Sequence, residues 1–481
     1  MTETYDVVVI GSGPNGLAAA IAMLRAGLSV HVIEAHATPG GGMRTTNLTL
    51  EGFEHDVCSS VHPLGIASPW FRAIKLEDHG LGWIHPSAPL AHVMGDGHAV
   101  MLERSLAATA AGLGEDGHAY TELMQPFVDE LDELFPDILG PLRFPEHPVR
   151  LARFGLEAIR SMRGLAESRF TGQAARALLG GIAAHAMIPL GDVATASFGL
   201  VLALAGHGSG WPIARGGSRA ICDALVAHLI ALGGTLELGH QISGYDELPL
   251  ARAYLFDTDP RQLEAICGDR LPAHYRARLE RFRYGPGVFK LDWALAEPVP
   301  WRDPACRRAG TVHLSGTLDD ILRAQAIVHE GKTGDRPFIL FGQPSLFDPT
   351  RAPAGKHTAW AYCHVPSNSD VDMTAVIEAR IEEFAPGFRD IILARASANP
   401  RQLAAYNPNC VGGDINGGLS DWRQLFFRPV ASADPYATGA PEIFLCSAST
   451  PPGGGVHGMC GYFAAASALH HVFGLAPPPL T

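Results

Sequence analysis

A glycine-rich turn between an apolar strand and a helix constrains this chain more than any other stretch. An apolar run at 7–10 leads into the turn Gly11-Ser12-Gly13-Pro14-Asn15-Gly16, which opens a helical pattern at 17–26. A second apolar run at 30–33 ends on Glu34. This order predicts a strand, turn, helix and strand unit that binds a dinucleotide, with its diphosphate at the N-terminus of the helix.

Each residue of this pattern has a physical reason. Gly11 permits the tight turn, Gly13 lets a diphosphate approach the backbone, and Gly16 lets the helix pack closely on the strand. Glu34 is placed to accept hydrogen bonds from ribose hydroxyls, and its charge disfavours the 2′-phosphate of NADP.

A second glycine turn decides which dinucleotide is expected. Gly41-Gly42-Met43-Arg44-Thr45 follows Glu34 closely and carries a cation. A nicotinamide domain has no need of this turn, whereas FAD has a long diphosphate and ribityl chain that it can contact. We therefore predict FAD as the cofactor. The cofactor-binding residues predicted here are Gly11, Gly13, Pro14, Asn15, Gly16, Glu34, Ala35, Gly41, Gly42, Met43 and Arg44.

Length and charge narrow the class of protein. A chain of 481 residues, 47% hydrophobic and 18% charged, suits two intertwined globular domains. The net charge of −13, with no block of Lys and Arg, argues against nucleic acid as a partner and leaves at most weak membrane association. The polar start leaves no room for a signal peptide, and no apolar run is long enough to span a bilayer. We expect a soluble, cytoplasmic protein.

The eight cysteines include no C-x-x-C pair and no zinc-like spacing with histidine. Reduced thiols are therefore expected rather than disulfides, a metal site or a redox dithiol. This argues against a disulfide reductase.

The pattern of apolar residues changes twice in the middle of the chain. From Pro69 to about Gly206 the pattern is helical, and 174–205 predicts a buried helical pair that can also form the wall of an apolar substrate tunnel. Ser218 is then expected to cap a helix at 219–231, and apolar runs at 235–238 and 254–256 are expected to return to the first sheet. The helices expected in the first of these regions are 105–112, 119–139 and 148–163.

The second half predicts a mixed sheet and a closing Rossmann strand. Alternating patterns favour antiparallel strands at 288–295, 311–314, 338–343 and 358–365, with helices at 318–330 and 373–384. A strand at 442–446, a glycine loop at 447–458 and a helix at 459–473 make an anion-stabilising corner suited to the pyrimidine end of a flavin.

The fold class predicted is α/β, with a Rossmann-type FAD-binding domain intertwined with a substrate domain of mixed sheet plus helices. The FAD-binding domain is assigned to 1–75, 208–286 and 431–481, and the substrate domain to 76–207 and 287–430.

Three motifs in this order carry a family resemblance. The N-terminal fingerprint, Arg215-Gly216-Gly217 and Pro452-Gly453-Gly454-Gly455-Val456 resemble those of the phytoene desaturase-like FAD-dependent oxidoreductases. The chain looks closest to the branch of pyridine-nucleotide-disulphide-oxidoreductase-domain-containing proteins. Segments 411–418 and 427–429 resemble the family stretch before its last flavin motif.

The resemblance implies a fold like that of amine oxidases and further contacts with the cofactor. It implies that the backbone of Ile242 meets the adenine and that Ser449, Gly455 and Val456 contact the isoalloxazine. It also implies removal or movement of hydrogen on long apolar, often isoprenoid, substrates, with oxygen or a quinone as electron acceptor. The sequence departs from the family at His457, where a proline is common.

The leading hypothesis is a dehydrogenase or desaturase that passes hydride from an apolar substrate to the flavin. Candidates for a companion base are His62, Asp414 and His457, although each also suits a purely structural role. Three alternatives stay open: a redox-neutral isomerase or hydratase, an amine oxidase with aromatic residues from among Tyr406, Tyr436 and Tyr462, and an FAD-binding scaffold without activity. A homo-oligomer is also left open.

Overall fold

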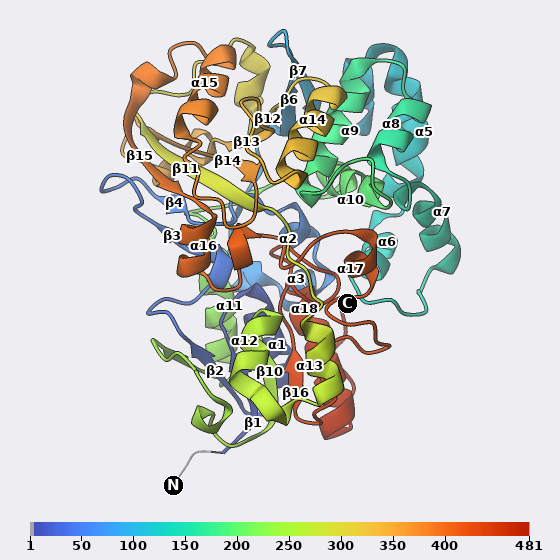
Figure 1. Ribbon diagram of the computed structural model, residues 1–481, viewed down its shortest axis with the longest axis vertical. Helices are drawn as coiled ribbons and strands as arrows, with labels where there is room; N and C mark the ends of the chain where they lie inside the picture. The colour runs from blue at the N-terminus through green and yellow to red at the C-terminus, as the bar shows by residue number, and fades with distance from the viewer. Residues whose placement is uncertain (1–3, 481) are drawn as a thin grey trace.

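The computed structural model describes residues 4–480, which form two lobes (Figure 1). The lower lobe in that view is built on a five-stranded parallel sheet in the order β16-β10-β1-β2-β9. Strands that are distant in the sequence therefore return to the first sheet, as predicted. These strands are β1 (Tyr5–Ile10), β2 (Val30–Glu34), β9 (Thr235–Leu238), β10 (Ala251–Phe256) and β16 (Ile443–Leu445).

Strand β1 is buried on both faces, which explains its unbroken apolar run. Val7 and Val9 pack in the core beneath helices α1 (Pro14–Arg25) and α18 (Met459–Ala468). Val8 and Ile10 face the opposite core, which also contains residues of α12 (Pro260–Cys267) and α13 (Ala273–Leu279). The sheet is therefore covered on both sides, as in other doubly wound folds.

The upper lobe contains a seven-stranded mixed sheet in the order β15-β11-β14-β13-β12-β6-β7. Its pairs are antiparallel except for β12 with β6, which is parallel. The strands are β6 (Ala88–Val93), β7 (Ala99–Leu102), β11 (Gly287–Leu295), β12 (Ala309–Leu314), β13 (Ile339–Gly342), β14 (His357–Val365) and β15 (Ile392–Ala398).

The prediction of an all-helical region from Pro69 to Gly206 was wrong for its first part. Strands β6 and β7 lie inside it, together with the short β5 (Trp83–Ile84), which pairs with β8 (Ile213–Ala214). Every residue of β6 is buried, and a short apolar run of that kind does not distinguish a buried strand from a piece of buried helix.

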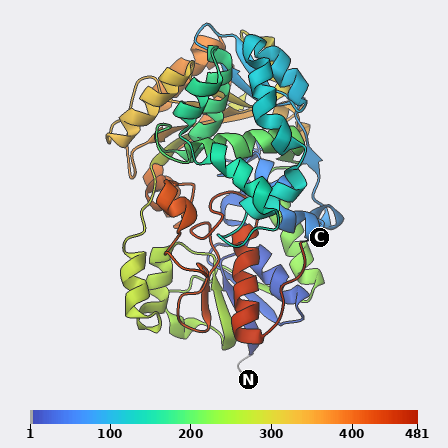
Figure 2. The same cartoon turned by 90° about the vertical axis from the view of Figure 1, so that its right-hand side faces the viewer.

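Most helices of the upper lobe lie on one side of this sheet (Figure 2). The predicted buried pair is present as α9 (Gln173–Ala183) and α10 (Thr195–Gly208), which pack against each other. The single helix expected at 119–139 is instead two, α5 (Gly117–Val128) and α6 (Leu131–Ile138), and that at 148–163 ends earlier, as α7 (Pro148–Ala158). The remaining helices of this layer are α4 (Leu106–Gly112), α8 (Met162–Arg169) and α14 (Leu318–His329). Helix α15 (Thr374–Phe384) packs on the opposite face of the sheet, against Trp293 and Phe341.

Four further helices lie between or beside the lobes, and their bounds are α2 (Pro63–Ala67), α3 (Pro69–Ile74), α16 (Pro400–Tyr406) and α17 (Trp422–Phe426). Helix α11 (Arg219–Ala231) begins after Ser218, as expected, but the Ser218 side chain does not cap it. That hydroxyl instead contacts the carbonyl oxygen of Ser59. Across residues 4–480, no helix is long and apolar enough to cross a membrane.

Candidate active site

A cavity of about 650 Å³ runs from the glycine loop of the lower lobe to the helical layer of the upper lobe. This volume lies within the usual range for sites that hold a cofactor or a small ligand. At one end it is lined by Gly13, Pro14, Asn15, Gly41 and Gly42, and its middle is lined by residues 451–457. The far end is apolar and includes Leu139, Leu151, Phe154, Ala158, Phe198, Val201 and Leu202.

The three glycines of the first turn are required by the backbone or by packing. Gly11 has a φ of +99°, in the left-handed region that favours glycine. A Cβ atom at Gly13 would lie 2.4 Å from Asp257 Oδ2, and one at Gly16 would lie 2.1 Å from the carbonyl oxygen of Gly11. The tight turn and the close packing of α1 on β1 are therefore present.

Asp257 is a site residue that the sequence patterns did not single out. It follows β10, whose carboxyl end lies beside that of β1, and its Oδ2 accepts a hydrogen bond from the Gly16 N–H at 2.9 Å. Burial raises the pKa of this carboxyl to about 8, although the N–H groups of Gly16 and Gly13 oppose the rise. At neutral pH the protonated group places little negative charge behind a loop suited to a diphosphate.

The structure places Glu34 and Arg44 in a buried polar cluster. Glu34 Oε1 lies 3.1 Å from Arg44 Nη2, and its Oε2 accepts hydrogen bonds from the N–H and hydroxyl of Ser12. Glu34 is thus tied to the first glycine turn and Arg44 to the second.

The other predicted cofactor residues divide into those that line the cavity and those that do not. Ser449, Gly455 and Val456 line it, and Ser449 Oγ donates to the Gly417 carbonyl oxygen at 3.0 Å. Ile242 lies in the core below the sheet. The predicted residues outside the lining are Gly11, Gly16, Glu34, Ala35, Met43, Arg44 and Ile242.

Both candidate histidines line the cavity and are buried. His62 Nε2 lies 2.9 Å from the hydroxyl of Ser218, and His457 Nδ1 accepts the N–H of Met459 at 3.1 Å. Burial lowers the pKa of each imidazole to about 4, so both are neutral at physiological pH. In His457 the proton must then lie on Nε2, because Nδ1 is an acceptor.

Asp414 also lines the cavity, but its carboxylate is already engaged. It accepts hydrogen bonds from the backbone N–H groups of Gly285 at 2.6 Å, Asn416 at 2.7 Å and Gly418 at 3.1 Å. Burial raises its pKa, and these N–H groups act in the opposite direction. The arrangement fixes the turn at 414–418, which is the structural role considered for this residue.

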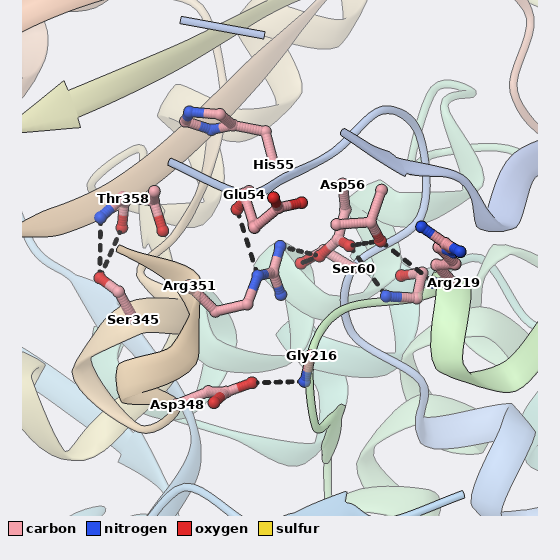
Figure 3. Close-up of polar contacts among 12 residues, drawn as sticks. Glu54, His55, Asp56, Ser60, Gly216, Arg219, Ser345, Asp348, Arg351 and Thr358 are labelled. Atoms are coloured by element: carbon pink, nitrogen blue, oxygen red, sulfur yellow. Dashed lines mark hydrogen bonds and ion pairs between the residues drawn. The ribbon is translucent and has the colours of Figure 1, made fainter. Parts of the chain in front are cut away.

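A buried ion pair holds the segment that carries His62 (Figure 3). Arg351 Nη2 lies 3.0 Å from Asp56 Oδ2, and both side chains are almost fully buried. Asp56 also accepts hydrogen bonds from the hydroxyls of Thr45 and Ser60 and from the N–H of Ser218. The network therefore joins 45–60 to the start of α11 and to the upper lobe.

Two structural features of the glycine loop suit a bound dinucleotide. Gly13, at the N-cap position of α1, has no side chain, and Gly13, Pro14 and Asn15 line the cavity. The N-terminus of the helix therefore faces the cavity, although Asp257 accepts the N–H of Gly16. The side-chain oxygen of Asn15 is buried there, and no partner for it occurs among residues 4–480. A helix N-terminus that faces the cavity suits an anionic group, and the orphaned acceptor oxygen of Asn15 suits a hydroxyl donor, so a ligand with both, such as a dinucleotide, fits this position.

Comparison with known proteins defines the class. Residues 9–75 match the family described as NAD(P)-binding Rossmann-like domain, so the N-terminal segment is a Rossmann-like dinucleotide-binding domain. Over most of its length it is similar to pyridine nucleotide-disulfide oxidoreductase domain-containing protein 2 of Rattus norvegicus. The two are 25% identical, over 96% of this chain and 92% of the relative. This confirms the branch that the motifs indicated.

Solved structures confirm the predicted fold class. An oxidoreductase from Methanosarcina mazei matches with a TM-score of 0.65 and 15% identity, over 97% of this chain and all of the other. Putrescine oxidase, as an A394C mutant, matches with a TM-score of 0.61 and 17% identity, over 98% and 99% of the two chains. The two-lobed arrangement is therefore that of amine oxidase-type flavoenzymes.

Proposed function

We propose that this protein is an FAD-dependent dehydrogenase or desaturase of an apolar, isoprenoid-like or lipid-like small molecule. The observation that supports this most is the continuity of one cavity from the glycine loop to an apolar wall. A dinucleotide at the loop would extend its reactive end toward that wall. Oxygen or a quinone is the proposed electron acceptor.

The residues that would hold the cofactor lie on both glycine turns and on the C-terminal loop. The first turn offers the open N-terminus of α1, and the Arg44–Glu34 pair ties the second turn to the end of β2. Residues 453–456 line the middle of the cavity. When bound, FAD supplies the hydride-accepting chemistry, and the protein supplies orientation and a dry environment.

The apolar end of the cavity favours a hydrophobic substrate. Phe198, Val201 and Leu202 come from α10, and Leu151 and Phe154 come from α7. Such a wall removes apolar surface from water, at about 25 cal/mol per Å². Asp137 also lines the cavity, but its carboxylate already accepts hydrogen bonds from the backbone N–H groups of Glu146 and His147.

The residues suggested for an amine oxidase do not support that alternative. Tyr406, Tyr436 and Tyr462 are absent from the cavity lining, and the hydroxyl of Tyr436 donates to the Pro451 carbonyl oxygen. Tyr362 is the tyrosine that lines the cavity within residues 4–480. A redox-neutral isomerase or hydratase would use the same apolar wall. Only an experiment distinguishes that function from a dehydrogenase.

An anaerobic absorbance assay tests the proposed activity. Purified holoprotein is mixed in turn with isoprenoids, fatty acids, alkenes and amines, and the flavin bands are recorded. The proposal predicts bleaching by an apolar compound and recovery with air or a quinone. Bleaching by amines alone would overturn it. Conversion of an alkene by pre-reduced protein without reoxidation would instead favour the redox-neutral reaction.

A further inference from the structure

Three histidines that are far apart in the sequence form a row behind the cavity wall. His92 on β6 and His313 on β12 lie opposite each other in these two parallel strands, and their ring centroids are 5.9 Å apart. His185 lies in the turn that follows α9, it lines the cavity, and its ring centroid is 5.1 Å from that of His313. Only strand pairing and the packing of α9 on the sheet bring these rings together.

His185 lies between the two parts of the cavity that the proposed function needs. The Asn416 side-chain N–H donates to the carbonyl oxygen of His185 at 3.3 Å. A Cβ atom on Gly454 would lie 2.8 Å from the carbonyl oxygen of Asn416, so this contact reaches the loop at 451–457 that lines the middle of the cavity. On its other side, the turn that carries His185 packs against α10, which supplies part of the apolar wall.

The two ring nitrogens of His185 have different surroundings. Its Nε2 lies 3.0 Å from Nε2 of His313, whose side chain is fully buried. Its Nδ1 has no hydrogen-bond partner among residues 4–480, and this atom is not fully buried. Burial lowers the pKa of His185 to about 4, so the neutral ring carries one proton at physiological pH. Nδ1 is the nitrogen left for a molecule in the cavity.

The neighbouring histidines decide which nitrogen holds that proton. His92 Nε2 lies 2.7 Å from the carbonyl oxygen of Gly316, so Nε2 carries the proton of this ring and Nδ1 is a bare acceptor. That Nδ1 and the Nδ1 of His313 are both buried without a partner. Both face Gly181, where an added Cβ atom would lie 2.5 Å from the first and 2.9 Å from the second. Two bare acceptors at such a place repel each other, which favours a proton on Nδ1 of His313.

This assignment fixes the state of His185 on the cavity wall. With its proton on Nδ1, His313 presents a bare Nε2, which accepts the Nε2–H of His185. The Nδ1 of His185 is then a bare acceptor. In His457, by contrast, Nδ1 already accepts a backbone N–H, and the carboxylate of Asp414 accepts three. His185 is therefore better prepared to take a proton than these two candidates.

We propose that His185 is the base of the reaction and that its Nδ1 takes the proton that leaves the substrate together with the hydride. His313 and His92 are positioning residues, because they hold the tautomer that leaves this Nδ1 bare. The proton transfer rests on the proposed function, whereas the tautomer of His185 does not.

The step balances with oxidised flavin as the oxidant. One C–H bond of the substrate breaks with its electron pair, and the hydride goes to the flavin. The neighbouring C–H bond gives its proton to Nδ1 of His185, and its electron pair completes the new C=C bond. The neutral imidazole becomes an imidazolium, whose Nε2–H makes a charge-assisted hydrogen bond to Nε2 of His313.

The first experiment determines which nitrogen of His185 carries the proton. Purified protein, isotope-labelled at the histidine ring nitrogens, is measured by NMR at neutral pH, and His185→Gln identifies the signals of this residue. The proposal predicts a bare Nδ1 and a protonated Nε2. A protonated Nδ1 would overturn the proposal, because that nitrogen cannot take a second proton.

Variants of His313 separate positioning from simple packing in the same experiment. His313→Gln keeps a side-chain oxygen that accepts the Nε2–H of His185, so the wild-type tautomer should persist. His313→Phe keeps a ring but no acceptor, so the proton should distribute over both nitrogens. An unchanged tautomer in a folded His313→Phe protein would refute the positioning role, and circular dichroism checks the fold of each variant.

The second experiment tests proton transfer in the holoprotein. Flavin bleaching is followed anaerobically with an apolar compound that bleaches the wild-type protein. His185→Gln should bleach at least about 100-fold more slowly, and imidazole added to His185→Ala should restore part of the rate. His207→Gln, at a buried histidine outside the cavity lining, is the control and should bleach as fast as the wild-type protein.

The outcomes distinguish this inference from the proposed function. Equal bleaching rates for His185→Gln and the wild-type protein would refute the role of His185 and leave the proposed function intact. If no apolar compound bleaches the flavin, the proposed function fails and the proton transfer fails with it, while the NMR experiment still decides the tautomer.

Discussion

The Oδ2 atom of Asp257 accepts a hydrogen bond from the backbone N–H of Gly16 at 2.9 Å, which joins the end of β10 to the first turn of α1. A carboxyl group thus lies behind the loop at which we place an anionic diphosphate. The two are compatible because burial raises the pKa of Asp257 to about 8, so the group is protonated at neutral pH.

Asp257→Asn should make stability less dependent on pH. The folded protein holds a proton on this carboxyl up to about pH 8, whereas the unfolded chain loses it near the ordinary aspartate pKa of 3.8. The contribution of this carboxyl to the free energy of unfolding is therefore present at low pH. It declines as the pH rises toward 8, by up to about 1.4 kcal/mol per pH unit. Asparagine keeps the acceptor oxygen without the charge. Urea unfolding between pH 5 and 8 should show a flatter profile for the variant, and an unchanged profile would contradict the assignment.

Gly16→Ala should disrupt the loop. The added Cβ atom would lie 2.1 Å from the Gly11 carbonyl oxygen, a contact that only backbone movement relieves. We expect a loss of at least about 2 kcal/mol in unfolding free energy, together with loss of bound cofactor. Gly112→Ala, at a helical position with open space around it, is the matched control and should be neutral or slightly stabilising. Thermal unfolding of both variants tests this prediction. Equal unfolding temperatures for Gly16→Ala and Gly112→Ala would argue against the close packing of Gly16 on Gly11.

The buried pair of Asp56 and Arg351 should show strong coupling. Arg351→Met leaves the Asp56 carboxylate without its counter-charge and should cost about 3–5 kcal/mol. The double variant Asp56→Asn/Arg351→Met should lose less than the sum of the single losses, by about 1–3 kcal/mol. As control, Arg219→Met removes an exposed pair with Asp223 and should cost less than about 1 kcal/mol. Additive losses in the double-mutant cycle would show that the charges do not interact.

His457 should contribute to acid sensitivity. Burial lowers the pKa of this imidazole to about 4 from the ordinary histidine value of 6.5, so the unfolded chain binds the proton first as pH falls. Stability from this group is therefore complete above pH 6.5 and is lost toward pH 4. His457→Asn keeps an acceptor for the Met459 N–H and should lessen that loss, while His457→Ala should also cost about 1 kcal/mol at pH 7. Unfolding free energies of the wild-type protein and both variants, measured at pH 7 and near pH 4, test this prediction.

The local features of the fold could be predicted from the sequence because each depends on residues that are adjacent in the chain. The turn at Gly11–Gly16 and the buried run of β1 need only a short window to be recognised. Strand β6 was missed because its buried run has no alternation, and the single helix expected at 119–139 was wrong because α5 ends at Val128.

The site itself depends on contacts between distant segments. Asp257 meets Gly16, and Arg351 meets Asp56, only once segments distant in the sequence have packed together. Ser218 occupies the expected cap position, but its side chain contacts Ser59 and His62 instead. No spacing along one chain encodes such contacts, so these roles required the structure.

The most direct test of the central claim is the visible flavin absorbance of the purified protein beside that of Gly13→Ala. The added Cβ atom would lie 2.4 Å from Asp257 Oδ2, on the loop where the diphosphate is placed. We predict a yellow wild-type protein that releases FAD on denaturation and a folded, colourless variant. A variant that retains the full flavin spectrum, or a wild-type protein that binds no flavin when FAD is supplied, would contradict the account.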